Sequence, residues 1–179
     1  GVLPCSEEEA AEFGTVRVDG TGRVLEFREK PKTAEARAGM EASPELLRAR
    51  GVPPGRPYLA SMGIYLFRKR TLVECLSSDL VDFGRDVIPS TVDERNVVAY
   101  FFAGYWRDIG TIRAFFDTHL DLVRPAPPFA FYADDWPFYT RPRYLPAAHL
   151  SGTRFVRSML ADGSVVKDAE IEDSIVGLR

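Results

Sequence analysis

The chain has 179 residues, of which 45% are apolar, and it carries 23 basic and 26 acidic side chains for a formal net charge of −3. This near-balance argues against a nucleic-acid-binding protein, which needs a basic surface. No apolar run approaches the ~18 residues of a membrane span, and the length suits one domain or one and a half. The two cysteines, Cys5 and Cys75, form neither a disulfide framework nor a zinc motif, which favours free thiols in a reducing compartment.

A β-hairpin is predicted over residues 13–29. Its strands, Thr15–Val18 and Val24–Phe27, alternate apolar and polar side chains, and the turn Asp19–Gly22 between them is rich in glycine. Residues 32–57 then form a long excursion that contains one short helix. That helix is expected to begin after the N-cap Ser43 and to end near residue 50.

The strongest strand signal lies at Tyr58–Phe67, which is mostly apolar and therefore expected to be buried on both faces. A helix follows over Lys69–Leu76, with Leu72, Val73 and Leu76 on one side. A short helix is predicted to hold Val87 and Ile88.

A further apolar strand is predicted at Val97–Phe102, and Thr111 is expected to cap the next helix. The inward face of that helix is predicted to carry Ile112, Phe115, Phe116, Leu120 and Leu122. The alternation of strands and helices indicates an α/β fold with a mixed sheet.

After residue 122 the composition changes twice. Six of the thirteen prolines lie between Pro125 and Pro146 among many aromatic residues, which predicts a connecting strap held on a surface rather than a disordered linker. Then Met159, Val165 and Ile171 recur every six residues, the signature of a parallel β-helix.

Two motifs have binding chemistry at strand ends. Glu29-Lys30-Pro31 places a carboxylate that accepts sugar hydroxyls beside an ammonium that holds a phosphate, although a solvated charge pair is the simpler alternative. Ser61 and Gly63 interrupt a buried strand. Ser61 offers a hydroxyl, and Gly63 allows a ligand or another backbone to come close, although a glycine needed only for packing is an equally good explanation.

Two further motifs are ambiguous when taken singly. The triplet 82–84, Asp-Phe-Gly, matches a kinase metal-binding motif, but neither the kinase catalytic loop nor its Ala-Pro-Glu motif accompanies it, which excludes a kinase. Asp108 lies just before a helix N-terminus, where it either stabilises the helix dipole or binds Mg²⁺.

The combination of motifs is far more specific than any one of them. In chain order the sequence contains Phe13-Gly14, Glu29-Lys30-Pro31, Ala60-Ser61-Met62-Gly63-Ile64-Tyr65, Asp82-Phe83-Gly84-Arg85-Asp86-Val87-Ile88-Pro89 and Gly104-Tyr105-Trp106-Arg107-Asp108-Ile109-Gly110-Thr111. With the proline- and aromatic-rich strap and the hexapeptide pattern that follow, the chain resembles the glucose-1-phosphate adenylyltransferase family, in its plant and cyanobacterial branch.

The resemblance implies three segments. Residues 1–122 correspond to the C-terminal portion of a Rossmann-like nucleotidyltransferase domain with a mixed sheet, residues 123–152 to the connecting strap, and residues 153–179 to the first hexapeptide repeats of a left-handed parallel β-helix. The implied reaction is adenylyl transfer from ATP to glucose 1-phosphate, giving ADP-glucose and pyrophosphate, with Mg²⁺ as cofactor. The implied assembly is a homo- or hetero-tetramer under metabolite control.

The resemblance also implies residue roles. Lys30 corresponds to the residue that holds the phosphate of glucose 1-phosphate, and Glu29 to the one that accepts hydrogen bonds from the sugar hydroxyls. Ser61 is implied to lie against the glucose and Gly14 to bring its backbone to the sugar nucleotide. Asp108 is implied to be one of two carboxylates that bind Mg²⁺, so that Lys30 and Asp108 are the expected catalytic residues.

The chain departs from the family pattern by omission. The glycine-rich loop that cradles the ATP phosphates, its basic residue and the first metal-binding Asp are absent, so we expect a fragment that is inactive alone. Two alternatives stay open: a non-catalytic regulatory subunit of the same assembly, and a related nucleotidyltransferase that uses another base or sugar phosphate. The presence of Lys30 and Asp108 favours a catalytic lineage. The expected location is the plastid stroma for a plant or alga, and otherwise the cytoplasm.

Overall fold

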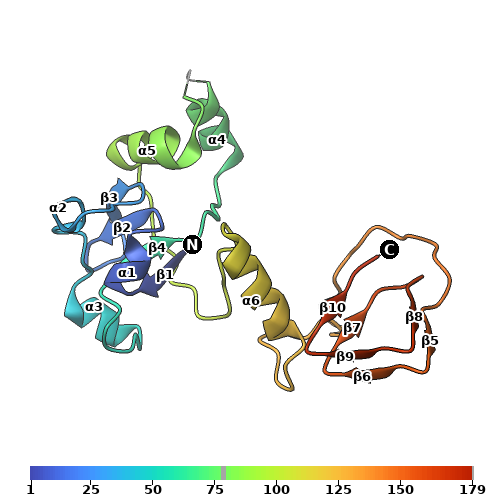
Figure 1. Cartoon of the computed structure of the whole chain (residues 1–179). Helices are drawn as coiled ribbons and strands as arrows, with labels where there is room; N and C mark the ends of the chain where they lie inside the picture. Colours follow the sequence, from blue (N-terminus) through green and yellow to red (C-terminus); the bar gives the residue numbers. More distant parts are fainter. Residues whose placement is uncertain (78–79, 179) are drawn as a thin grey trace. The chain divides into compact units, whose positions relative to one another are not determined.

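The computed structural model describes residues 1–77 and 80–178 and divides into two compact units, residues 1–104 and 105–179. Each unit has its own architecture (Figure 1). Across the described residues, no helix combines the length and the hydrophobicity needed to cross a bilayer. The domain boundaries predicted after residues 122 and 152 stay predictions.

The first unit is built on a four-stranded antiparallel sheet of order β1-β4-β2-β3. Its strands are β1 (Val2–Cys5), β2 (Thr15–Val18), β3 (Val24–Arg28) and β4 (Tyr58–Ser61). The predicted hairpin is confirmed, because β2 pairs with β3 and the Asp19 carboxylate closes the turn by accepting the amide of Thr21 at 2.8 Å. Val2 also forms a parallel bridge to Phe101, which makes the pairing mixed, as predicted.

Short helices connect the strands. They are α1 (Glu7–Ala10), α2 (Ala34–Arg37), α3 (Pro44–Ala49), α4 (Lys69–Leu76), the π-helix η1 (Phe83–Val87) and α5 (Ile88–Glu94). The predicted cap of α3 is confirmed, since the Ser43 side chain accepts the amide of Leu46 at 3.2 Å. Sequence periodicity missed α1 and α2, because a helix of one turn is too short to show a 3.6-residue repeat.

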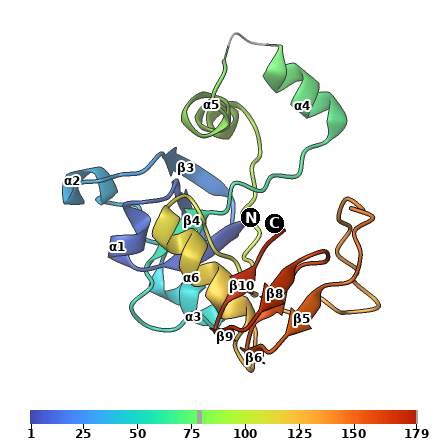
Figure 2. The ribbon, with the colours of Figure 1, turned by 45° about the vertical axis from the view of Figure 1, so that its right-hand side comes forward.

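The core of this unit joins the sheet to α5, which lies against β3 (Figure 2). The buried cluster comprises Val2, Val16, Val18, Val24, Phe27, Ala42, Leu46, Leu59, Ile88 and Val92. Each such side chain contributes about 1.5–3 kcal/mol when removed from water, so this cluster holds the strand ends in place.

Two predicted strands are shorter than expected. The strand predicted at Tyr58–Phe67 ends at Ser61, which pairs with Val2, and Gly63 beyond it has a φ of +69°. Beyond it Ile64 and Leu66 are exposed rather than buried. The segment predicted as Val97–Phe102 forms only isolated bridges, and the predicted apolar side of α4 is half exposed at residues 73 and 76.

The second unit begins with α6 (Ile112–Leu122), whose predicted cap is confirmed, because the Thr111 hydroxyl accepts the amide of Ala114 at 3.1 Å. The prediction that its apolar side chains all face inward is wrong: Ile112, Phe115 and Phe116 are exposed. Only Leu120 and Leu122 are half buried. In the segment that follows, aromatic rings pack on one another at Phe129, Phe131 and Phe138, with Tyr105 against the first of them.

Residues 149–176 form two stacked turns of short parallel strands (Figures 1 and 2). The strands are β5 (His149–Ser151), β6 (Arg154–Val156), β7 (Met159–Leu160), β8 (Val165–Lys167), β9 (Glu170–Glu172) and β10 (Ile175–Val176). β5 pairs with β8, β6 with β9 and β7 with β10, each in parallel.

The details of the repeat differ from the prediction. Paired residues such as Phe155 and Ile171 stack in register, whereas Val165, which was grouped with Met159 and Ile171, is 63% exposed. The corners of the turns have positive φ at Arg157, Asp168 and Asp173, as well as at two glycines. Ion pairs also connect the two turns: Nε of Arg157 lies 2.7 Å from Oδ1 of Asp173.

Candidate functional site

The ends of three strands meet at one edge of the sheet in the first unit. Thr15 of β2 lies opposite both Arg28 of β3 and Ala60 of β4. Because β2 runs antiparallel to both neighbours, the residue before β2, the residues after β3 and the last residue of β4 come to the same edge. The topology therefore gathers Gly14, Glu29, Lys30 and Ser61, all of which were singled out in the sequence.

Direct contacts join three of these residues. The Ser61 amide donates a hydrogen bond to the Gly14 carbonyl at 2.7 Å. The Oε2 atom of Glu29 lies 3.0 Å from the position that a Cβ atom would occupy at Gly14. The Glu29 carboxylate is exposed and therefore accessible to a ligand.

A second glycine borders the same carboxylate. A Cβ atom at Gly84 would lie 3.0 Å from Oε2 and 3.5 Å from Cδ of Glu29. The carboxylate thus lies between the backbones of Gly14 and Gly84, and it has room there only because neither residue has a side chain.

Gly84 reaches this position through a π-helical turn. The Asp82 side chain caps η1 by accepting the Arg85 amide at 2.8 Å, and the Val87 amide donates to the Asp82 carbonyl at 3.0 Å, five residues apart. Single π-helical turns occur frequently at functional sites. Here the turn carries the glycine to the Glu29 carboxylate.

Two hydroxyl groups lie in the same part of the unit. The Ser61 Oγ and the Tyr65 hydroxyl are 3.1 Å apart, and the Gly63 amide lies 3.4 Å from the same Oγ. The Tyr65 ring stacks on Phe83 with centroids 6.4 Å apart and an interplanar angle of 21°. This stacking ties the hydroxyl pair to the turn that carries Gly84.

Lys30 follows directly and has unusual backbone geometry. Its φ of +43° lies in the left-handed region, which side chains other than glycine, Asn and Asp adopt rarely. Its side chain is exposed, while the neighbouring Pro31 is buried and anchors the turn. The hydrogen bond and charge of Lys32, together with the charge of Lys30, lower the pKa of Glu12.

Asp108 belongs to the second unit. Its carboxylate is exposed and folds back over Gly110, with Oδ2 3.0 Å from where a Cβ atom would lie there. The cap of α6 is Thr111, so Asp108 is not needed for capping. Among the described residues no cluster of three or more His, Cys, Asp or Glu side chains could hold a metal ion. A single accessible carboxylate nevertheless suits Mg²⁺, which is usually bound by one or two carboxylates together with substrate phosphates and water.

Comparison with known protein families places this geometry in context. Residues 2–124 match the nucleotidyl transferase family, and residues 143–179 match the GLGC left-handed parallel β-helix domain. The first match covers well over half of the chain.

The chain belongs to the nucleotidyl transferase family.

The expected fold class is confirmed: a nucleotidyl transferase domain is followed by the start of a left-handed parallel β-helix. The order of the two domains is consistent with the glucose-1-phosphate adenylyltransferase family and supports a sugar-1-phosphate nucleotidyltransferase.

The sequence missed part of the site in the transferase unit. Phe83 and Gly84 were weighed only as part of a kinase-like triplet, and Tyr65 only as part of a longer run, whereas the structure joins all three to the edge that carries Glu29. The available signal was the acidic cap at Asp82 followed by glycine, which predicts a tight turn but not the partner that the turn approaches.

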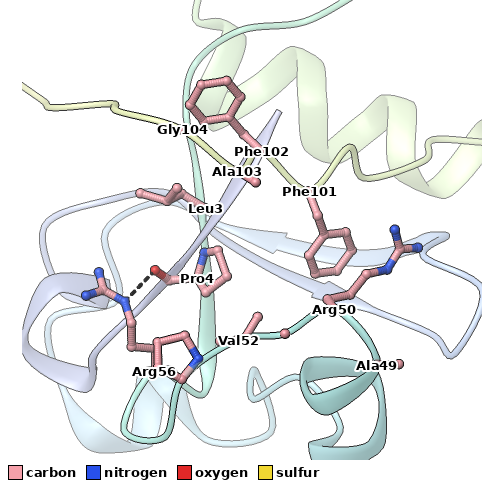
Figure 3. Close-up of a pocket in the computed structure, with 12 residues that line it drawn as sticks. Leu3, Pro4, Ala49, Arg50, Val52, Arg56, Phe101, Phe102, Ala103 and Gly104 are labelled. Carbon is pink, nitrogen blue, oxygen red and sulfur yellow. Dashed lines mark hydrogen bonds between the residues drawn. The ribbon is translucent and has the colours of Figure 1, made fainter. Parts of the chain in front are cut away.

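A separate cavity of about 620 Å³ lies elsewhere in the transferase unit (Figure 3). Its walls include Leu3, Val52 and Phe101, and Arg56 at its rim donates from Nε to the Pro4 carbonyl at 2.8 Å. None of the predicted site residues lines this cavity. Arg50 and Arg56 also line it, and the site is assigned to the edge of the sheet because the predicted residues Gly14, Glu29 and Ser61 lie together there.

Proposed function

We propose that this nucleotidyl transferase transfers the adenylyl group of ATP to glucose 1-phosphate, giving ADP-glucose and pyrophosphate. The observation that carries the proposal is the Glu29 carboxylate between Gly14 and Gly84, with Lys30 next to it in the chain. A carboxylate that accepts hydroxyl protons beside an ammonium is the combination that a sugar phosphate requires. The β-helix domain that follows supports the adenylyl-transferring branch of the family.

In this reaction a phosphate oxygen of glucose 1-phosphate attacks the α-phosphorus of ATP, and the bond to the departing pyrophosphate breaks. Because the chemistry is an exchange between phosphates, the protein contributes mainly positioning and charge neutralisation. Lys30 would hold the attacking phosphate, while Glu29 accepts hydrogen bonds from the sugar hydroxyls. Ser61 and the Gly14 backbone, which lie beside Glu29, would also contact the sugar.

Mg²⁺ would neutralise the charge of the phosphates, and Asp108 is the residue of this chain whose carboxylate would hold it. We also propose a tetrameric assembly of homo- or hetero-subunits, as the family resemblance implies.

The test is ADP-glucose formation from ATP, glucose 1-phosphate and Mg²⁺ by the protein expressed from its complete reading frame. Lys30→Ala should raise the KM for glucose 1-phosphate about 10- to 150-fold, because a charge-assisted hydrogen bond contributes about 1.5–3 kcal/mol. Lys32→Ala is the matched control: this neighbouring ammonium binds Glu12 at 2.9 Å and should have little effect. Asp108→Ala should lower kcat rather than raise the KM for glucose 1-phosphate. Its control is Asp93→Ala, because Asp93 is also exposed.

The same assay separates the alternatives. Activity with UTP or dTTP but not with ATP would replace the adenylyl assignment with that of a related sugar-1-phosphate nucleotidyltransferase. A folded, assembled protein that is inactive with every nucleotide would indicate a regulatory subunit.

A further inference from the structure

The turn that carries Lys30 has a backbone conformation that needs support. Lys30 has a φ of +43°, and Pro31 directly after it is buried. A residue with a side chain stays in the left-handed region only where the surrounding structure holds it there. The proline ring fixes φ at Pro31, so the direction in which the chain leaves Lys30 depends on the orientation of the peptide groups that follow.

Those peptide groups are held by Arg37, the last residue of α2. Its Nη1 donates to the Pro31 carbonyl at 3.0 Å and to the Lys32 carbonyl at 2.9 Å. Its Nη2 donates to Oε1 of Glu7 at 3.0 Å, which ties the turn to α1. One guanidinium thus fixes two successive carbonyl groups beyond Lys30 and connects them to a separate helix.

Helix α2 is also held from the other end of the turn. Arg28 ends β3, and its Nη1 donates to the Ala36 carbonyl at 2.8 Å and to the Ala38 carbonyl at 3.1 Å. The two charged site residues therefore lie in a segment that Arg28 precedes and Arg37 follows. Both arginines connect that segment to α2.

Stability of the core does not explain Arg37. Its side chain is only 11% exposed, and its Nε atom is buried without a hydrogen-bond partner among the described residues. A buried donor without a partner is unfavourable, and none of the four residues of α2 is fully buried. The carbonyl groups that the guanidinium holds account for this arginine better than packing does.

We propose that Arg37 is a positioning residue for sugar phosphate binding, which acts by holding the turn that presents Lys30. The position requires a guanidinium, because a single ammonium nitrogen cannot take the places of both Nη1 and Nη2. This inference rests on the proposed function, since it takes Lys30 as the group that holds the phosphate.

The first measurement is the KM for glucose 1-phosphate of the protein expressed from its complete reading frame. Arg37→Ala should raise this KM about 5- to 10-fold, because a displaced Lys30 holds the phosphate less well. The kcat and the KM for ATP should stay within about twofold of those of the unsubstituted protein. Loss of stability alone would instead lower kcat with the folded fraction and leave both KM values unchanged.

The matched control is Arg48→Ala. Arg48 belongs to the neighbouring short helix α3, donates from Nε to the Pro44 carbonyl at 3.2 Å and pairs with Glu45. It therefore makes the same kinds of contact as Arg37 but at a distance from the turn in the chain. Arg48→Ala should leave the KM for glucose 1-phosphate unchanged.

Two further variants separate positioning from a general effect of charge. Arg37→Ala should add nothing to the KM when Lys30 is already alanine, because residues that act through one another are not additive. Arg37→Lys keeps the charge but loses the planar fork, so its KM should stay at least about threefold above that of the unsubstituted protein. Additive effects in the double variant, or full recovery with lysine, would overturn the proposal.

A second measurement follows the turn without any substrate. The backbone carbon chemical shifts of Lys30, recorded in lysine-labelled protein, report whether this residue stays in the left-handed region. They should move toward extended values in Arg37→Ala and stay in place in Arg48→Ala. An unmoved Lys30 in Arg37→Ala would overturn the proposal.

The two measurements also separate this inference from the proposed function. If the unsubstituted protein forms no ADP-glucose, the proposed function fails, and the chemical shifts of Lys30 then decide by themselves whether Arg37 holds the turn. If ADP-glucose forms but the KM for glucose 1-phosphate is the same in Arg37→Ala, the proposed function stands and the positioning role of Arg37 is overturned.

Discussion

Gly84→Ala is expected to impair sugar phosphate binding without unfolding the protein. The added methyl group would lie 3.0 Å from Oε2 of Glu29, closer than carbon and oxygen atoms ordinarily approach. The Glu29 side chain is exposed and can move aside, so the strain costs little stability. The carboxylate then leaves the position that the two glycines define.

The magnitude follows from the hydrogen bonds that the displaced carboxylate would lose. A hydrogen bond to a charged group contributes about 1.5–3 kcal/mol, which corresponds to a change of about 10- to 150-fold in an equilibrium constant. We therefore expect the KM for glucose 1-phosphate to rise at least about 10-fold. The melting temperature should shift by only a few degrees, because substitutions at adaptable sites usually change stability by less than about 0.5 kcal/mol.

The assay is the initial rate of ADP-glucose formation as a function of glucose 1-phosphate, together with a thermal melt of each variant. Glu29→Ala sets the largest effect that loss of the carboxylate can have. Gly20→Ala is the control, because a Cβ atom there meets nothing within 4 Å. An unchanged KM in Gly84→Ala, alongside a raised KM in Glu29→Ala, would refute the idea that Gly84 positions the carboxylate.

Four further outcomes are expected. Gly14→Ala would place a Cβ atom 2.4 Å from Cζ of the buried Phe27, so chemical denaturation should show a loss of about 1–3 kcal/mol, partly restored by Phe27→Leu. Burial raises the pKa of Cys5 from 9.0 to about 12, so the unfolded chain releases this proton at lower pH than the folded chain. The free energy of unfolding should therefore fall as the pH rises from 9 toward 12, and urea titrations should show a smaller fall in Cys5→Ala. Thr111→Ala removes the cap of α6 and should lower helix stability by about 1 kcal/mol, visible as faster amide exchange in its first turn. Arg157→Ala removes ion pairs across the β-helix turns and should lower the melting temperature at low salt but not at high salt, as followed by circular dichroism.

The sequence was sufficient to predict those elements that depend on interactions between residues close together in the chain. The hairpin around Asp19 and the cap at Ser43 depend on turn and capping side chains that act on the adjacent backbone. The parallel β-helix followed from apolar recurrence, although Val165, which shares the six-residue spacing of Met159 and Ile171, is exposed.

Long-range packing decided what local pattern did not. The apolar run after Ser61 predicts a continuous buried strand, but the last ladder pair joins Ser61 to Val2 and the chain then turns through a positive φ at Gly63. Beyond that point Ile64 and Leu66 have no covering element in the described structure, so their apolar character did not lead to burial. The exposed face of α6 shows the same limit, because periodicity identifies an apolar face but not what packs on it.

The same distinction between local sequence and tertiary packing holds for the candidate site. The sequence by itself identified the candidate residues, since a carboxylate and an ammonium at Glu29 and Lys30 are recognisable wherever the chain places them. Only the tertiary structure determined that Gly14 and Gly84, seventy residues apart, both border that carboxylate. A glycine works here through the volume that it leaves empty, and that volume has meaning only once another segment of the chain has folded against it.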